Sequence, residues 1–370
     1  MREILFVVGE ASGDLHAGKV AEAIRATRPD QPMAGIGGEY MRAAGVSILE
    51  PVERLAVMGF AEVLAHIPRH WMLLRTLRSR IEGGHVGLVV LIDYPGFNLK
   101  VAEVAHRAGI PVLYYITPQV WAWGAGRLPT LARLVTRAAP ILPFEEALLR
   151  QHGIDATFVG HPLLDRASSL PSVAEARSAL GLSPDGEVLA VFPGSRHAEL
   201  AQHLKPFIAT ARELQRRRPG MQVIVSVAPT VRVDPADCPF PLVHGQSFTV
   251  LRAATAGLLK SGTTTLEAAV ADLPHVIGYR TSAVTYAIAR RLVKIPHIGL
   301  VNVVAGREVS KEFVQDAFVP HRVADALEPL LDASSTASST ARAGLAEVRD
   351  RLGTPGASVR VATMALEMVT

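Results

Sequence analysis

The 370-residue sequence has a single cysteine, Cys238, and no long apolar run. One cysteine excludes an internal disulfide and any site built on several cysteine ligands, which agrees with a reducing compartment. The longest aliphatic stretches, such as LVVLI at 88–92, are far shorter than the roughly 20 residues of a spanning helix. The N-terminal run ILFVV stops at Gly9 and Glu10, which is too short for a signal-peptide core. These absences predict a cytoplasmic protein without a transmembrane segment.

A large excess of charge of one sign is also missing. The chain has 38 lysines and arginines against 34 aspartates and glutamates, a formal net charge of +4. This small excess suits phosphate groups or an anionic membrane surface better than the polyanionic surface of a nucleic acid. We therefore predict no nucleic-acid partner.

The motifs of two common nucleotide sites do not occur. Neither GEASGD at 9–14 nor GIGG at 35–38 is a G-x-G-x-x-G fingerprint, and no GxxxxGK[ST] P-loop is present. His197 and His203 have the wrong spacing for two metal ligands on one helix face. The sequence thus predicts no dinucleotide cofactor and no metal site.

What the sequence does have is a regular alternation of short apolar runs with helical patterns. ILFVV precedes an expected helix over 15–27, and EVLAVFPG begins a second such series after a polar linker at 168–172. This alternation is typical of βαβ units around a parallel sheet. We expect an α/β protein of two Rossmann-like domains with parallel sheets that face one interdomain cleft.

The expected domain boundaries follow from composition. The N-terminal domain would span residues 1–165 and the C-terminal domain residues 175–335. The polar segment DASSTASST at 332–340 reads as flexible. The final helices, 341–370, would then pack back on the N-terminal domain or on a partner chain.

The turn GEASGD holds the first candidate site residues. It lies where the first strand ends and a helix begins, which is where open α/β sheets bind ligands. Gly9 and Gly13 would let the backbone approach a ligand closely. The alternative is a tight βα turn in which Ser12 and Asp14 cap the helix.

Asp93 ends the apolar run GLVVLID and is the candidate general base. Burial at the end of such a strand would raise its pKa toward the range of a useful base. The alternative is a helix-capping aspartate in a proline turn. His16 and His161 lie in similar turns, where a lone histidine is more often structural than catalytic.

The stretch FPGSRHAEL at 192–200 brings Ser195 and Arg196 from an apolar strand to the start of a helix. Helix starts have free N–H groups and partial positive charge, so a cation there indicates a bound anion such as phosphate. The alternative is that Ser195 is an ordinary N-cap and Arg196 a solvated side chain.

KSGTTTLEAA at 260–269 repeats this arrangement. Ser261, Gly262 and Thr263 would open a helix with free N–H groups, and the Glu267 carboxylate could accept the hydroxyls of a ribose. The alternative is that Thr263 caps the helix and Glu267 completes a capping box. Together the two turns predict a site for a nucleoside diphosphate and its sugar.

Aromatic residues are few, at 5% of the chain, but some lie in informative places. Residues 56–80 form a basic amphipathic pattern around Trp71, typical of either a membrane-surface helix or a surface helix that turns an apolar stripe to the core. Trp121 and Trp123 follow a strand and would line an apolar groove or fill a domain interface.

Taken together, these motifs resemble the lipid-A-disaccharide synthase family. The matching stretches run in order from residue 9 to about 315 and include the neighbourhoods of Met41 and Met58–Gly59, then IDYPGFN, YYITPQVWAWGAGR, LPFE, FVGHPL, FPGSR, KSGTTTLEAA and NVVAGREVSKEFVQ. The combination of PQVWAW with PGSR and SGTTTLE is the specific part. The resemblance implies the GT-B glycosyltransferase architecture, with residues 1–165 binding acceptor and lipid and 175–335 binding the UDP-sugar.

The resemblance also implies the reaction, an inverting and metal-independent transfer of 2,3-diacylglucosamine from UDP-2,3-diacylglucosamine to 2,3-diacylglucosamine 1-phosphate. The products would be a β-1,6-linked disaccharide and UDP. The enzyme would act peripherally at the inner face of the inner membrane, as a homodimer with exchanged C-terminal parts. Asp93 would take the proton of the acceptor 6-hydroxyl, and Arg196 would steady the diphosphate.

Further substrate contacts are implied in the same way. Ser261, Gly262 and Thr263 would hold phosphate, and Glu267 the ribose. Asn302, Glu312 and Gln315 fall in the motif NVVAGREVSKEFVQ, which would also face UDP. The other candidate substrate-binding residues are Gly9, Glu10, Ser12, Gly13, Asp14, His16, Asn98, Gln119, Trp121, His161 and Ser195. The chain has Val301 where the family usually has proline, which would loosen the turn that presents Asn302.

Two other functions share part of this pattern. A UDP-N-acetylglucosamine 2-epimerase, or another UDP-sugar transferase, would have similar UDP motifs, although an epimerase needs no apolar groove. A non-catalytic, membrane-associated UDP-sugar or lipid-binding protein would keep both glycine turns but would not need Asp93. Fold alone does not separate these chemistries.

Overall fold

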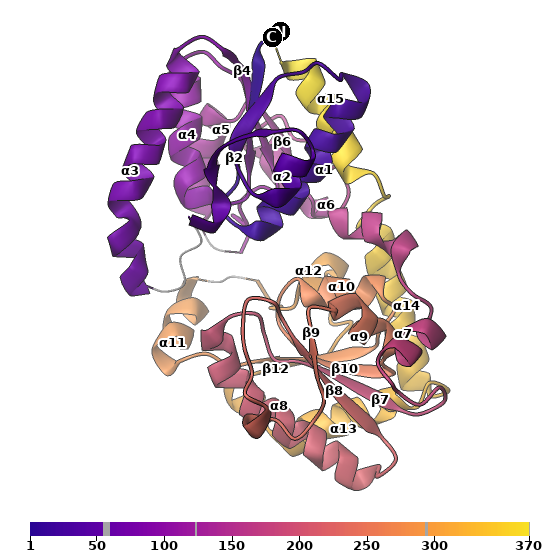
Figure 1. The fold of residues 1–370 in the computed structure, drawn as a ribbon. Coiled ribbons are helices and arrows are strands. Elements are labelled where there is room, and N and C mark those ends of the chain that lie inside the picture. Colours follow the sequence, from indigo (N-terminus) through magenta and orange to yellow (C-terminus); the bar gives the residue numbers. More distant parts are fainter. Residues whose placement is uncertain (55–59, 123, 293–294, 370) are drawn as a thin grey trace. The chain divides into compact units, whose positions relative to one another are not determined.

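The computed structural model describes residues 1–54, 60–122, 124–292 and 295–369 (Figure 1). The chain divides into two compact units: unit 1 is Met1–Asp165 with Gly353–Thr370, and unit 2 is Arg166–Leu352. Each unit contains one six-stranded sheet in which all strand pairs are parallel. The predicted α/β fold with two Rossmann-like halves is confirmed.

Unit 1 has the strand order β3-β2-β1-β4-β5-β6. Its strands are β1 (Glu3–Val7), β2 (Met33–Gly37), β3 (Ser47–Pro51), β4 (Val86–Ile92), β5 (Val112–Tyr115) and β6 (Arg137–Ala139). Its helices are α1 (Ala11–Thr27), α2 (Glu39–Ala43), α3 (Phe60–Glu82), α4 (Pro95–Arg107), α5 (Leu128–Leu134), α6 (Pro143–Gln151) and α15 (Ala357–Met368).

Both faces of this sheet are covered, so its central strands can be apolar throughout. All seven residues of β4 are buried, as expected for a parallel strand between two helical layers. Leu5, Val89 and Leu91 pack in a cluster with α3, α4 and α5. The alternate residues Ile4 and Val90 pack on the opposite side with α1 and α15.

Unit 2 repeats the topology with the order β12-β11-β10-β7-β8-β9. Its strands are β7 (Val188–Phe192), β8 (Gln222–Val227), β9 (Leu242–His244), β10 (Ala256–Lys260), β11 (His275–Tyr279) and β12 (Glu312–Val314). Its helices are α7 (Val173–Ala179), α8 (His197–Arg217), α9 (Ser247–Ala253), α10 (Thr264–Val270), α11 (Ala283–Leu292), α12 (Leu300–Ala305), α13 (Pro320–Leu331) and α14 (Thr336–Arg351).

The strand order reverses at one point in each sheet, between β1 and β4 in unit 1 and between β7 and β10 in unit 2. Open α/β sheets bind ligands outside the carboxyl ends of the strands at such points. The loops that follow these four strands are 8–10, 93–94, 193–196 and 261–263. Each of these loops contains part of one motif that the sequence analysis selected, in order GEASGD, IDYPGFN, FPGSR and KSGTTT. We call 193–196 and 261–263 the two glycine turns.

Helix α1 starts earlier than the sequence analysis expected. It begins at Ala11 rather than near residue 15, so most of GEASGD is already helical. The polar residues of this stretch suggested a turn, but polar and acidic side chains are also favourable in a first helical turn.

The C-terminal helices divide between the two units. Residues 341–370 were expected to leave the C-terminal domain and pack on the N-terminal one or on a partner chain. In the structure the chain returns to unit 1 only at Gly353, because α14 belongs to unit 2. The segment 332–340, interpreted as flexible, starts α14 instead: the Ser335 hydroxyl caps it by accepting the N–H of Ser338 at 3.0 Å. Arg342 and Arg349 of α14 pair with Asp272. Helix α15 packs on unit 1.

None of the described helices combines the length and the apolarity that crossing a bilayer requires.

Candidate active site

Asp93 and Tyr94 form an unusual turn directly after β4. Both have a φ of 48°, a left-handed conformation that is uncommon for residues other than glycine and costs free energy. The Asp93 carbonyl is fixed by the Asn98 side-chain amide and the Tyr114 hydroxyl, each of which donates to it at 2.7 Å. The strained backbone therefore presents the Asp93 carboxyl in a defined position.

Gly9 makes room for this turn. A Cβ built on Gly9 would lie 2.1 Å from Cγ of Tyr94, so only glycine lets the tyrosine ring pack against the loop after β1. The Tyr94 hydroxyl lies 2.7 Å from Nε2 of His70 on α3. The sequence analysis gave Tyr94 no role. The one feature of the sequence that pointed to this packing is the glycine at position 9.

Gly9→Ala tests this packing by thermal unfolding. We expect a loss of about 1–3 kcal/mol of stability, because the added methyl displaces a packed ring. Gly96→Ala in α4 is the matched control, because a Cβ there meets no atom of the described residues within 4 Å outside its chain neighbours and its own helix backbone. Equal melting temperatures for the two variants would contradict the account.

Two carboxylates shape the charge at this end of unit 1. Burial raises the pKa of Asp93, the nearby Glu10 raises it further, and the Tyr94 backbone N–H lowers it. An aspartate with a raised pKa is better matched to proton abstraction near neutral pH than an ordinary one. Asp93 thus has the environment of a general base.

The capping alternative for Ser12 and Asp14 is wrong. The N-cap of α1 is Glu10, without a side-chain cap hydrogen bond. The Ser12 hydroxyl donates to the Glu10 carboxylate at 2.6 Å. Asp14 is buried and accepts backbone N–H groups at the start of α2, among them that of Gly38 at 2.6 Å. Gly13 packs closely on the side chain of Val8.

The other candidate residues of unit 1 are two histidines, His16 and His161, and the loop after β5 that contains Gln119 and Trp121. His161 is buried and accepts the Leu163 N–H; burial and the neighbouring His16 lower its pKa to about 3, so it is neutral. Trp121 donates its ring N–H to Glu145 at 3.0 Å. Gln119 is exposed, whereas Trp123 and Met58–Gly59 lie outside the described residues.

The first glycine turn of unit 2 holds a network of charges. Arg196, not Ser195, is the N-cap of α8, and it makes no side-chain cap hydrogen bond, so the capping alternative for Ser195 is wrong. The Ser195 N–H donates to the Glu199 carboxylate at 2.9 Å. The Arg196 side chain is 75% exposed and lies 3.3 Å from Glu199. Its guanidinium thus has most of its donors available to a ligand.

The second glycine turn is similarly open. Gly262 has a φ of +154°, and a Cβ there would meet, among the described residues beyond its chain neighbours, only Nζ of Lys260 within 4 Å. The Ser261 hydroxyl donates to the Ile298 carbonyl at 2.7 Å. Thr263 is exposed at the N-cap of α10 without a side-chain cap hydrogen bond.

Glu267 is partly buried in the first turn of α10. Since the N-cap Thr263 makes no side-chain cap bond, the capping box is not formed and that alternative is wrong. Burial raises the pKa of Glu267, and the nearby Arg166 lowers it.

Sequence reasoning missed one ion pair that joins the two turns. Lys260, the last residue of β10, lies 2.8 Å from Glu199, and both side chains are mostly buried. The signal was present, because a lysine that ends a buried strand lies at the ligand-binding edge of the sheet.

The motif NVVAGREVSKEFVQ, residues 302–315, forms hydrogen bonds that fix the neighbouring loops. Asn302 is fully buried; its amide donates to Ser310 and Glu312, and its oxygen accepts two backbone N–H groups. Glu312 also accepts two backbone N–H groups, and Gln315 bonds both backbone groups of Thr281. These side chains hold loops in place.

Val301 does not loosen this motif as expected. Its N–H, which a proline would lack, donates to the Thr265 hydroxyl at 3.3 Å. Asn302 is held by the bonds described above. The turn is therefore fixed by hydrogen bonds rather than by a ring.

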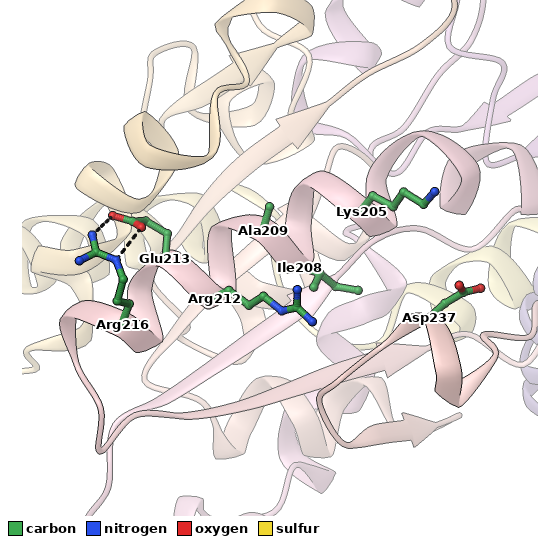
Figure 2. Close-up of a pocket in the computed structure, with 7 residues that line it drawn as sticks. All are labelled: Lys205, Ile208, Ala209, Arg212, Glu213, Arg216 and Asp237. Atoms are coloured by element: carbon green, nitrogen blue, oxygen red, sulfur yellow. Dashed lines mark hydrogen bonds and ion pairs between the residues drawn. The ribbon is translucent and has the colours of Figure 1, made fainter.

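A hollow of about 490 Å³ on unit 2 lies elsewhere, along α8 (Figure 2). Lys205, Arg212 and Arg216 line it, with Arg216 paired to Glu213. None of its lining residues belongs to the glycine turns. Among the described residues, no group of three or more histidine, cysteine or acidic side chains is placed to hold a metal ion.

Comparison with known proteins identifies clear relatives. The family model described as lipid-A-disaccharide synthetase matches residues 4–357. The lipid-A-disaccharide synthase of Geobacter metallireducens is 41% identical over 100% of this chain and 97% of its own length. The synthase of Geobacter sulfurreducens is 43% identical over 99% of this chain and 97% of its own length. The synthase of Myxococcus xanthus is 38% identical over 99% of this chain and 97% of its own length.

Solved structures show the same fold at much lower identity. The UDP-GlcNAc 2-epimerase of Neisseria meningitidis, bound to UDP-GlcNAc, has a TM-score of 0.65 at 12% identity and covers 99% of this chain and 100% of its own. A glycosyltransferase of kitacinnamycin has a TM-score of 0.66 at 14% identity, with coverages of 100% and 99%. The GT-B architecture implied by the motifs is confirmed. At these identities the likeness concerns the fold alone.

Proposed function

The chain belongs to the lipid-A-disaccharide synthase family, and from that premise we propose that it joins two acylated glucosamines through the residues at its two switch points. It transfers 2,3-diacylglucosamine from UDP-2,3-diacylglucosamine to 2,3-diacylglucosamine 1-phosphate and releases UDP. The observation that carries the proposal is the placement of a raised-pKa carboxyl in unit 1, and of the exposed Arg196 and the open Gly262 in the two glycine turns of unit 2, all at switch points.

Asp93 is the general base of this reaction. Its carboxylate removes the proton of the acceptor 6-hydroxyl while that oxygen bonds to the anomeric carbon of the donor. The bond from the anomeric carbon to the β-phosphate oxygen breaks, and the electron pair leaves with UDP. Gly9 and Glu10 on the neighbouring loop, with Ser12 and Gly13 in the first turn of α1, border the acceptor.

The glycine turns of unit 2 receive the nucleotide. Backbone N–H groups at helix starts bind phosphate well, and the exposed Arg196 guanidinium adds a charge where the leaving group becomes negative. Glu267 accepts the ribose hydroxyls. Asn302, Glu312 and Gln315 support the UDP site by holding its loops, since their polar groups are already bonded to the protein.

Helix α3 supports a role at a membrane surface. Trp71 and Met72 are 69% and 72% exposed, next to the exposed Arg75 and Arg78. Exposed apolar side chains among arginines suit an anionic lipid surface and the acyl chains of the substrates. Sedimentation with anionic and with neutral vesicles tests this. The side chains of 56–68 lie outside the described residues.

A dimer with exchanged C-terminal helices is the remaining proposal. Helix α15 follows the linker 353–356 and packs on unit 1 through side chains such as Val361 and Ala365. The same contacts could form between two copies. Light scattering gives the mass of the particle in solution.

The test of the function is direct. The purified protein is incubated with UDP-2,3-diacylglucosamine and 2,3-diacylglucosamine 1-phosphate, and the products are identified by mass spectrometry. We expect the disaccharide and UDP in equal amounts. Lipid binding without any disaccharide would overturn the proposal, as would conversion of UDP-N-acetylglucosamine to its 2-epimer in a parallel incubation with that sugar nucleotide. The epimerase is disfavoured because UDP-GlcNAc 2-epimerase structures share only the fold, at 12–13% identity, whereas lipid-A-disaccharide synthases are 38–43% identical over nearly the whole chain.

Glu10→Gln tests the electrostatic environment of the base. Glu10 raises the pKa of Asp93, so removing its charge lowers that pKa and leaves Asp93 ionised at lower pH. The acidic limb of the kcat/KM profile should move to lower pH. Glu22→Gln, at an exposed position further along α1, is the control. An unmoved acidic limb would show that Glu10 and the base are not coupled.

A further inference from the structure

One buried ion pair in unit 2 lies between the two glycine turns. Oε1 of Glu199, in the first turn of α8, is 2.8 Å from Nζ of Lys260 at the end of β10. The Lys260 and Glu199 side chains are only 16% and 14% exposed. We propose that Lys260 binds the diphosphate of the UDP-sugar and its leaving charge, and that Glu199 is the positioning residue that holds Lys260 between the turns. This rests on the proposed function.

The position of the ammonium group supports a ligand role. Apart from Gly262 and its chain neighbours, Nζ of Lys260 is the only atom of the described residues within 4 Å of the point where a Cβ on Gly262 would sit, at 3.4 Å from it. The open space on the second glycine turn is therefore bordered by a positive charge. Nζ also lies 6.0 Å from the ring centroid of Tyr279.

The hydrogen-bonding capacity of Lys260 is not used up. An ammonium group has three N–H donors, and the one hydrogen bond recorded for Lys260 in the described part of the chain is to Glu199. Two donors remain for phosphate oxygens. Burying a lysine with spare donors is costly unless a partner offsets its charge, and Glu199 does so while leaving the donors available.

Glu199 is itself held at the first glycine turn. It accepts the Ser195 N–H at 2.9 Å. Gly194 has a φ of +128°, and a Cβ there would lie 2.7 Å from Cβ of Glu199, so glycine makes room for the glutamate. Although burial raises the pKa of Glu199, Lys260, Ser195 and Arg196 together lower it below its usual value. The glutamate is therefore charged, and its carboxylate fixes the ammonium group of Lys260.

The charges add up to a site for an anion. Lys260 and Arg196 supply two positive charges, and Glu199 supplies one negative charge, so the cluster keeps a net positive charge. The negative charge on the β-phosphate oxygen grows as its bond to the anomeric carbon breaks. A lysine that contacts this oxygen stabilises the transition state more than the bound substrate.

The test measures binding of uridine, UMP and UDP by calorimetry to the wild-type protein and to Lys260→Met. We expect UDP affinity to fall ~10- to 100-fold, as for lost charge-assisted hydrogen bonds, while uridine affinity changes less than about twofold. Lys260→Arg should retain part of the UDP affinity. Lys205→Met removes the same charge from an exposed position on α8 (Figure 2) and should change nothing.

The positioning role is tested by Glu199→Gln alone and combined with Lys260→Met. If Glu199 acts through Lys260, Glu199→Gln lowers kcat and UDP affinity in the wild-type background and has no further effect in Lys260→Met. Tighter UDP binding by Glu199→Gln, or additive losses in the double variant, would overturn the positioning role.

The two proposals fail in different ways. Unchanged UDP affinity in both Lys260→Met and Lys260→Arg would overturn the role of Lys260 while leaving the proposed function intact. Failure of the wild-type protein to bind UDP at all would overturn the proposed function itself.

Discussion

Asp93→Asn should abolish sugar transfer in a protein that still folds and still binds UDP. Asparagine has nearly the same shape, and the contacts that fix this turn go to the Asp93 backbone carbonyl rather than to its carboxyl. The amide cannot take the proton of the acceptor hydroxyl. Loss of a general base lowers the rate by ~100- to 10,000-fold.

The stability of Asp93→Asn follows from the direction of the pKa shift. The folded protein raises the pKa of Asp93, so between its unfolded and folded pKa values the folded state binds more protons than the unfolded state. Stability then decreases as pH rises through that window, and at neutral pH the ionised carboxylate is a net cost. Asp93→Asn removes this cost and should unfold at the same temperature as the wild type or higher.

Single-turnover rates, UDP titration and thermal unfolding at neutral pH check these expectations together. Asp30→Asn, at an exposed site in unit 1, is the matched control and should behave as the wild type. If Asp93→Asn transfers sugar within tenfold of the wild-type rate, the base is another group.

Arg196→Ala should slow turnover by ~100-fold or more, since removing a donor aimed at developing transition-state charge has that effect. The structure predicts little loss of stability. The Arg196 side chain is 75% exposed, so its 3.3 Å i,i+3 contact with Glu199 is screened by water on the arginine side and worth about 0–1 kcal/mol. The effect should therefore appear in kcat and in UDP affinity, not in the melting temperature.

The control for Arg196→Ala is Arg212→Ala, an exposed arginine on the same helix (Figure 2). Arg196→Lys should recover only part of the rate, because an ammonium group cannot make the paired contacts of a guanidinium. Turnover near the wild-type rate in Arg196→Ala would remove this residue from the mechanism.

The site loops were predictable because they depend on local patterns. Apolar runs such as VGLVVLI identify buried strands, and the polar residue after each run, such as Asp93, must lie at the carboxyl edge of a parallel sheet. The same logic located Arg196 and Gly262. Local patterns did not decide whether a polar residue caps its own helix. Asp14, considered as a cap of α1, instead accepts the N–H of Gly38 at the start of α2, 24 residues further along the chain.

The remaining features depend on contacts between distant segments. Glu199 and Lys260 are 61 residues apart and meet only because β7 and β10 are neighbours in the sheet. Gln315 likewise meets Thr281, 34 residues earlier in the chain, because β12 pairs with β11. No period or spacing in the sequence contains that information.

A crystal structure with UDP bound tests the central claim most directly. The account predicts the diphosphate within hydrogen-bonding distance of the backbone N–H groups at both glycine turns and of Arg196, with the ribose hydroxyls at Glu267. A nucleotide bound away from both turns would contradict it.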